Sequence, residues 1–476
     1  MSSEETPLLT PAIDDASPED CTQAELHDAV YARFTPTRKR VIVALVSSAG
    51  LLPMFVAGSF VPSIPQIARE LDSTGSVINL AISTSIFSGA IGTLTWATYS
   101  GFYGRRPIYL VSLPIFTIGS LGVTFARTVP ELMSWRVLQA FGAGGGLSVG
   151  AGVIGDIYRL EERGTAMGIF FAATLVGPAI APLTGGLATH YASWRVMQGA
   201  LFATGLTAFT FMYFLLPETS QPRSRGMDKL LEREGDPDGW RWVLLNPFRP
   251  IPLLRSPNIL AVCLTGAFAL ITNYTLLTPL YYTIGQRYGL ENEAVVGAFF
   301  LPAGLGNLIG APLAGRISDR VVIRWKTRRG GVWVPEDRLR GAKASALVFV
   351  PLSVLTSGIV THFVSGTLGI VLNLLCLFMN GVSIDLIFTP VAAYNVDIMH
   401  SRSAEVMAVT SALRSLITAF ATAAFLPLIN NIGVLPTDAL SATLAWIGFG
   451  LLWTTIQYGD RMRAWVDIGY STAQDN

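Results

Sequence analysis

Long stretches without a charged residue dominate this chain. Eleven of them reach at least 19 residues, among them 41–68, 73–104, 164–194, 256–286 and 344–384. A helix needs about 20 apolar residues to cross the hydrocarbon core of a bilayer, and an apolar run above about 18 residues is typical of such a helix. The pattern therefore predicts transmembrane α-helices and a function that takes place across a membrane.

Twelve spans result when the longest stretch, 344–384, is divided at its polar middle and some spans extend over one internal charge. Composition agrees, because 14% of the residues are charged, against roughly a quarter in a soluble chain. The predicted fold is an all-α polytopic membrane protein with twelve transmembrane helices in two six-helix bundles. We expect the helices to be centred near Leu51, Phe87, Phe116, Ala143, Val176, Ala208, Ile271, Leu305, Leu352, Cys376, Thr422 and Gly448.

A charged, proline-containing segment divides the chain in the middle. A second loop, 316–343, is long and basic, which predicts contact with acidic membrane lipids. We expect a polar amino-terminal tail at 1–40, a first bundle at 41–217, a central loop at 218–255, a second bundle at 256–458 and a tail at 459–476.

Basic residues predict the orientation, because Lys and Arg that flank a span stay in the cytoplasm. Of the 33 Lys and Arg residues, two lie within predicted spans, and four fall on the outer side if both termini are cytoplasmic: Arg69, Arg127, Arg195 and Arg287. An odd number of helices would scramble this distribution, so it supports both the count of twelve and two cytoplasmic termini.

The amino-terminal tail has no basic segment followed by an apolar one, so we expect no cleaved signal peptide. Residues 4–9, Glu-Glu-Thr-Pro-Leu-Leu, fit the acidic dileucine pattern read by eukaryotic sorting adaptors. The three cysteines are dispersed and the four histidines scattered, which predicts no disulfide framework, metal site or cofactor.

Three charged side chains fall inside predicted spans: Arg136, Asp385 and Arg414. A charge at this depth costs at least about 2.5–3.5 kcal/mol on insertion scales, so each should face the bundle interior and have a use. Asp385 could bind a proton, pair with an arginine, or lie near the cytoplasmic mouth. Two arginines and one carboxylate would leave a shared cavity net positive, which favours an anion.

The turn at Gly104, Arg105 and Arg106 resembles the end of the signature G-x-x-x-D-R/K-x-G-R-R/K of the major facilitator superfamily, although Gly101 stands at its acid position. The second half keeps the other part, with Gly315, Asp319 and Arg320. In that family the acid caps a helix and clamps the two bundles together. The resemblance implies a clamp that depends on Asp319 more than on the first-half loop, unless both loops are only topological turns.

The span around Ala143 contains Arg136 and Gln139, similar to the family's R-x-x-Q-G-x-G motif. Proton coupling is what this resemblance implies. A guanidinium keeps its proton near neutral pH, so Arg136 would act by shifting a neighbouring carboxyl or by holding an anion. The alternative is an arginine that pairs with a helix carbonyl or reaches outward.

The fifth predicted span resembles the antiporter signature of drug:proton antiporters, in the fungal form with two prolines. Prolines kink a helix and glycines let a neighbouring helix approach closely, so this span is the expected moving element, with packing alone as the alternative. The matching residues are Gly177, Pro178, Pro182, Gly185 and Gly186.

Further similarity to the fungal twelve-span drug:proton antiporters lies at Trp194–Arg195, 216–219 and 335–339. This branch implies proton-coupled antiport export of a drug or secondary metabolite by alternating access. The alternatives are an exporter of an organic acid such as the dicarboxylate itaconate, and an uncoupled facilitator or transporter-like sensor, suggested by the missing acid at Gly101. No enzyme motif or nucleic-acid-binding patch is recognisable.

Transporter sites lie near the membrane midplane between the halves. The expected partners are a small-molecule substrate, protons and membrane lipid, for a monomer in the plasma membrane, with the vacuolar or endosomal membrane as the alternative. The polar and aromatic candidates for the substrate cavity are Asn273, Tyr274, Tyr281, Asn373 and Asn380.

Overall fold

The computed structural model describes residues 31–158, 160–221, 225–234, 243–290, 292–399 and 402–466. These residues form helices and connections without a strand. Among them are twelve helical segments long and apolar enough to cross a membrane. Each predicted centre, from Leu51 to Gly448, lies inside one of these segments, so the predicted twelve-helix fold is confirmed.

The first half contains six spanning segments. The first of them bends at Gly58 and continues through a 3₁₀ turn into the short helix α3 (Ile64–Glu70). The segments are α2 (Pro36–Gly58) with α3, α4 (Gly75–Tyr103), α5 (Arg105–Phe125), α6 (Val129–Ile157), α7 (Leu160–Tyr191) and α8 (Trp194–Leu215). A short helix, α9 (Gly226–Glu234), follows in the central loop.

The second half repeats the pattern with α10 (Pro257–Leu277), which leads into a π-helical turn at Tyr281–Gly285. Two short helices, η2 (Ile251–Arg255) and α13 (Asp337–Arg340), lie outside the spans. The other spanning elements are α11 (Glu293–Ala298) with α12 (Phe300–Arg328), η4 (Ser345–Phe349) with α14 (Val350–Phe363), α15 (Gly366–Ile398), α16 (Ser403–Ile432) and α17 (Val434–Trp465).

Local sequence explains several helix ends. The side chains of Thr74 and Thr128 accept hydrogen bonds from the first turns of α4 and α6, as helix-capping threonines do. Gly104 joins α4 to α5 with a φ of 106°, and Gly433 joins α16 to α17 with a φ of 89°. Only glycine adopts such angles without strain, so these two residues permit the abrupt reversals.

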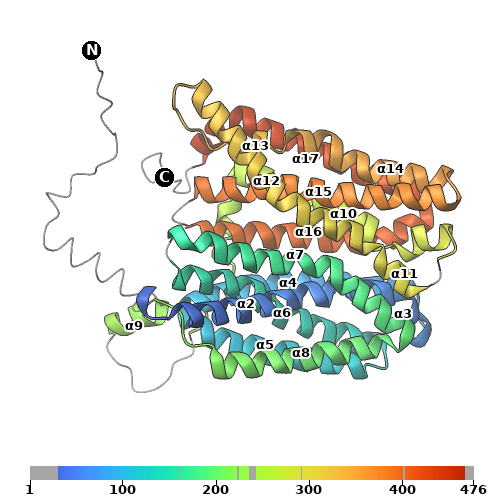
Figure 1. Cartoon of the computed structure of the whole chain (residues 1–476), viewed down its shortest axis with the longest axis horizontal. Helices are drawn as coiled ribbons and strands as arrows, with labels where there is room; N and C mark the ends of the chain where they lie inside the picture. The colour runs from blue at the N-terminus through green and yellow to red at the C-terminus, as the bar shows by residue number, and fades with distance from the viewer. Residues whose placement is uncertain are drawn as a thin grey trace, which may run out of the picture.

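Each half has its own hydrophobic cores. Two clusters of buried side chains belong to the first half, and two belong to the second. In Figure 1 the first-half helices, blue to green, lie together beside the second-half helices, yellow to red. We call the end where α2 begins and α17 ends the terminal face, and the other end, near α3 and α11, the opposite face (Figure 1).

Candidate functional site

The two halves are held together at the opposite face by a polar cluster centred on Glu293 of the second half. Its carboxylate lies 3.2 Å from the guanidinium of Arg69 and 3.4 Å from His190 Nδ1, both in the first half. The amide of the adjacent Asn292 lies 3.3 Å from His190 Nε2. A second polar contact between the halves joins α4 to α16, where the Asn79 amide donates to the backbone carbonyl of Thr422 at 2.7 Å.

The backbones of the two halves also meet directly beside this cluster. A Cβ on Gly186 of α7 would overlap the Glu293 carbonyl, and a Cβ on Gly297 would lie 2.5 Å from the Pro182 carbonyl. Gly304 of α12 packs against Ala179 in the same way. The missing side chains therefore allow α7 to close against α11 and α12, as small residues do at membrane helix contacts.

Near the terminal face, by contrast, ion pairs join helices of the same half. Arg105 binds Asp156 at 2.8 Å, while Arg463 binds Glu336 within the second half. The structure therefore represents a state in which the halves are sealed at the opposite face.

Arg136 is fully buried in α6, where its fractional exposure is 0%. Its Nη1 donates to the Val56 carbonyl of α2 and to Gln139 Oε1, each at 3.0 Å. Its guanidinium stacks on the Phe60 ring, 4.2 Å from the centroid. Nε and Nη2 are buried without a hydrogen-bond partner among the described residues. These two nitrogen atoms can therefore still donate to a group that enters the site.

Gln139 connects this arginine to the rest of the first half. Its Nε2 donates to Ser120 Oγ and to Gln198 Oε1, each at 3.0 Å. Because its nitrogen is held by Ser120 and Gln198, the amide of Gln139 has a fixed orientation. Its oxygen, which accepts from Arg136, therefore helps to fix the position of the guanidinium. The sequence motif predicted the pair, but Ser120 and Gln198 carried no signal of their own.

Asp385 and Arg414 lie in the second half. Asp385 packs beside Gly310 of α12, is 8% exposed, and has one buried carboxylate oxygen without a partner among the described residues. Arg414 is half-buried, stacks on Phe388 at 4.7 Å and lies near Tyr274. No ion pair joins either residue to another residue that the structure describes, nor does one involve Arg136.

The remaining cavity candidates fall into two groups. Asn380 donates to Thr272 and Ser353 and accepts from Asn273, while Asn373 accepts from Ser357 and donates to Tyr288. Both asparagines are buried and tie α15 to its neighbours, which favours a structural role. Tyr281 and Tyr282 form an edge-to-face pair at 5.3 Å, and Tyr282 covers Gly75 of the first half.

The glycines of α7 pack against different neighbours. A Cβ on Gly177 would lie 2.5 Å from the Met54 Cβ, and one on Gly185 would overlap the Ser59 carbonyl, so both contact α2 in the same half. Gly186 faces the second half instead. Pro178 and Pro182 lie between these contacts, inside the helix. Neighbouring positions of this motif therefore serve different contacts.

At the terminal face, Glu218 supplies a carboxylate next to the first-half motif, which lacks its acid at Gly101. Its carboxylate accepts from the backbone N–H groups of Arg105 at 3.0 Å and Arg106 at 3.3 Å, directly after Gly104. It thereby caps α5 with a negative charge, which the positive end of a helix dipole favours. A Pro-Glu pair supplies this carboxylate, and the same pair recurs at Pro335–Glu336.

The second Pro-Glu pair organises the terminal end of the second half. Glu336 is buried and binds Arg463 and Tyr394, while the neighbouring Asp337 binds Arg329, raising the pKa of that guanidinium through the hydrogen bond. Asp319 pairs with Arg338 at 3.3 Å within the same half, and Arg320 is exposed. A clamp between the bundles through Asp319 stays a prediction.

Sequence reasoning gave no role to three carboxylates that the structure makes prominent: Glu218, Glu293 and Asp438. Glu218 belongs to the family-like segment 216–219 but had no expected partner, and Glu293 resembles an ordinary charge at the start of a span. Asp438 is a second buried carboxylate inside a span, 3% exposed, packed against Gly358 of α14. Asp438 is the fifth residue of α17, and a carboxylate at that position in a span is the sequence feature that could have identified it.

Two six-helix bundles with charged side chains inside their spanning segments form the architecture of a membrane transporter. The family model "Major Facilitator Superfamily" matches residues 46–422 of the chain. The protein belongs to this superfamily, whose members transport solutes across membranes, and it is not an enzyme.

Three curated fungal relatives illustrate the range of the similarity. Efflux pump FUBT of Fusarium oxysporum is 27% identical, with 92% of this chain and 75% of the relative covered. Citrate exporter 1 of Aspergillus niger is 27% identical over 60% of this chain and 58% of the relative. The match to the MFS-type transporter phiD of Fungal sp., 27% identical over 63% of this chain, spans about half of that relative, 49%.

The fold is also that of a solved transporter. The crystal structure of a D-xylose-proton symporter superposes with a TM-score of 0.64 at 15% identity, with 87% of this chain and 97% of the symporter covered. At this identity the likeness concerns the fold.

Weakening the Glu293 cluster should release the seal at the opposite face. Glu293→Gln keeps the shape of the side chain but removes the charge that Arg69 and His190 contact. Because Arg69 is 70% exposed, the expected shift toward the open state is modest, up to about fivefold. The measurement is labelling of Val61→Cys by a membrane-impermeant maleimide, since Val61 packs against both halves.

The exchange variant Arg69→Glu/Glu293→Arg should return the labelling rate toward that of the parent protein. Equal labelling of Glu293→Gln and the parent would show that this ion pair does not hold the seal.

Proposed function

We propose that this protein exports a small organic molecule in exchange for protons, by alternating access between its two faces. The observation that carries the proposal is Asp385, a buried intramembrane carboxyl with an oxygen that has no described partner. Such a group exchanges a proton without breaking an ion pair. Intramembrane ionisable residues of this kind mark proton and substrate pathways.

Arg136 and α7 have complementary roles in this proposal. Arg136 holds two unused donors in the interior of the first half, which suits an anionic group or a carboxyl that changes its charge. Gly186 provides the close contact that forms when the opposite face is sealed. The efflux-pump relative supports the direction of transport.

An organic acid is a second candidate substrate, favoured by Arg414. This guanidinium is half-buried, stacked on Phe388 and without an ion-pair partner among the described residues. An arginine fork binds a carboxylate through two parallel hydrogen bonds. The similarity to a citrate exporter supports the same class of substrate.

The terminal face is cytoplasmic in this proposal, so both termini lie inside the cell, and the protein acts as a monomer in the plasma membrane. The basic residues that flank the spans on that side support the orientation.

The proposal is tested by uptake into everted membrane vesicles, with and without an imposed pH gradient, using dicarboxylates, citrate and cationic drugs as substrates. We expect uptake of one class to require the gradient. Asp385→Asn should abolish gradient-driven uptake but keep exchange of labelled for unlabelled substrate, because the binding site is intact. Gradient-independent flux in the parent protein would instead identify a facilitator, and binding without flux a sensor.

A further inference from the structure

The segment 243–255 connects the two halves at the terminal face. It is fixed to the first half because the backbone N–H groups of Val243 and Leu245 donate to the hydroxyls of Tyr103 and Tyr99, at 2.7 and 3.3 Å. At its other end Leu253 is buried in the core of the second half. The segment therefore lies across the boundary between the halves.

This segment exposes apolar side chains that no described part of the chain covers. Leu244 is 94% exposed, Phe248 46% and Ile251 45%. The segment contains two arginines, Arg249 and Arg255, and no acidic residue. Both are exposed and form no hydrogen bond or ion pair through their side chains with another described residue. Apolar contact area and unpaired positive charge are thus combined in thirteen residues.

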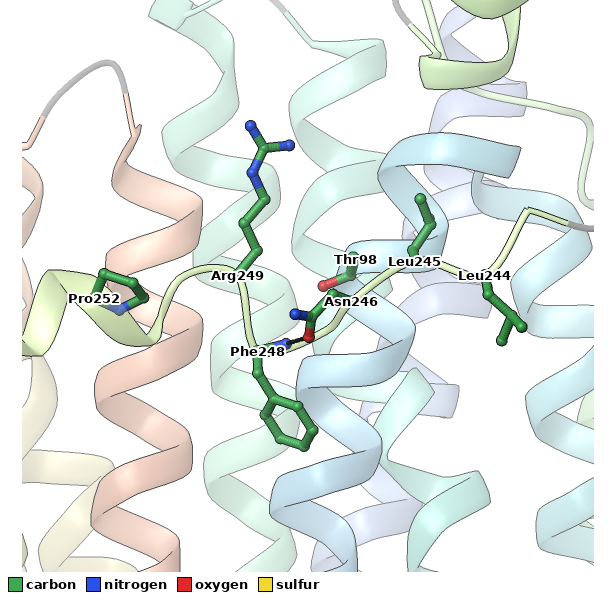
Figure 2. A pocket seen from close by; sticks show the side chains of 7 residues that line it. All are labelled: Thr98, Leu244, Leu245, Asn246, Phe248, Arg249 and Pro252. Atoms are coloured by element: carbon green, nitrogen blue, oxygen red, sulfur yellow. Dashed lines mark hydrogen bonds between the residues drawn. The ribbon is translucent and has the colours of Figure 1, made fainter.

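The apolar and basic groups point in different directions. In Figure 2, Phe248 points along α4 toward the membrane-spanning part of the bundle, whereas Arg249 points the other way. Asn246 accepts a hydrogen bond from the Phe248 N–H at 2.9 Å, which stabilises this turn. An interfacial segment has the same arrangement, with its apolar side in the acyl layer and its basic side among headgroups.

A recess of about 510 Å³ lies between this segment and Thr98 of α4 (Figure 2). Thr98 follows Phe87, Ile91 and Thr95 at helical spacing, so these side chains share one face of α4. Phe87 is 41% exposed in the middle of a spanning helix, so the protein leaves this face of α4 uncovered there. The recess therefore opens at the terminal end of an uncovered face of α4, where an acyl chain has room to lie.

We infer that residues 243–255 and Thr98 form a binding site for an anionic phospholipid. The phosphate contacts Arg249, with Arg255 adding positive charge, and the acyl chains lie against Leu244, Phe248 and the uncovered face of α4. Because the segment is attached to both halves, the bound lipid lies where they move relative to each other during transport.

The test uses the full-length protein in phosphatidylcholine vesicles, with bimane attached to Leu244→Cys in a Cys21→Ser background. The other two cysteines, Cys263 and Cys376, are buried. Spin-labelled phosphatidylglycerol should quench the bimane at lower concentration than spin-labelled phosphatidylcholine. Arg249→Gln should reduce this preference about fivefold, because one basic side chain near an anionic surface contributes about 1 kcal/mol.

Arg324→Gln is the matched control, since Arg324 is an exposed arginine near the terminal end of α12, and it should leave the preference unchanged. Equal quenching by the two lipids, or a preference that survives Arg249→Gln combined with Arg255→Gln, would overturn the inference. Absence of quenching by either lipid would overturn it as well, because Leu244 would then not contact the bilayer.

Discussion

Replacing Arg136 with alanine should abolish transport in a protein that still folds and reaches the membrane. The side chain is completely buried, and two of its donors lack a described partner. Each unsatisfied buried donor costs about 1–3 kcal/mol, and removing these donors opposes the cost of the cavity that alanine leaves and of the Val56 and Gln139 oxygens that lose their donor. A side chain retained at such a cost is expected to act in transport rather than in folding.

The measurement combines substrate flux in vesicles with thermal unfolding of the purified protein. We expect flux near background in a protein that still shows a cooperative unfolding transition. Arg136→Lys keeps the charge but loses the planar fork, and should recover part of the activity if charge alone suffices. Arg127→Ala, at an exposed arginine of the opposite face, is the control. Parent-level flux in Arg136→Ala would refute a transport role.

Gly186→Leu should trap the protein with its opposite face open. A side chain at this position would overlap the Glu293 carbonyl of the other half, so the halves cannot close there. Because backbone atoms oppose the new side chain, a rotamer change does not relieve the overlap. We expect transport to fall to background and Val61→Cys to become labelled by an impermeant maleimide much faster than in Glu293→Gln.

Gly185→Leu provides a contrast at the adjacent residue. Its side chain would overlap Ser59 within the same half, so it should disrupt the packing of α7 against α2. Overpacking of this kind typically costs about 1–3 kcal/mol. We expect lost transport together with a lowered unfolding temperature, whereas Gly186→Leu unfolds near the parent temperature. Normal transport by both variants would contradict the prediction that α7 moves during transport.

Several elements of the fold were predictable because a bilayer restricts the options. Uncharged runs such as 73–104 and 256–286 must be helical, since every backbone polar group in lipid needs an internal partner. The same argument placed all twelve helix centres within the observed spans. Gly104 and the glycines of α7 were also recognisable, because a turn or a close helix contact selects glycine directly.

Partners far apart in the sequence were not predictable. Glu218 lies more than a hundred residues from the helix it caps, and nothing in the local sequence at that helix indicates that its capping carboxylate comes from there. The candidates Asn373 and Asn380 looked suited to a cavity because they are polar residues within a span. The structure places both of them in contact with α14. The rotation of α15 about its own axis determines which neighbour these side chains face, and the sequence does not give this rotation.

The sequence by itself determined the twelve spans, their division into halves, the superfamily motifs and the positions of Arg136, Asp385 and Arg414. These follow from local properties: length, apolarity and the cost of a charge in lipid. Only the tertiary structure decided that Gly185 faces α2 while Gly186 faces the other half, and that Glu293 joins the halves. It also decided that Arg136, Asp385 and Arg414 form no ion pair with another residue that the structure describes. Such contacts depend on how packed helices are rotated and which ends approach, and a rotation of about 100° separates one helix position from the next.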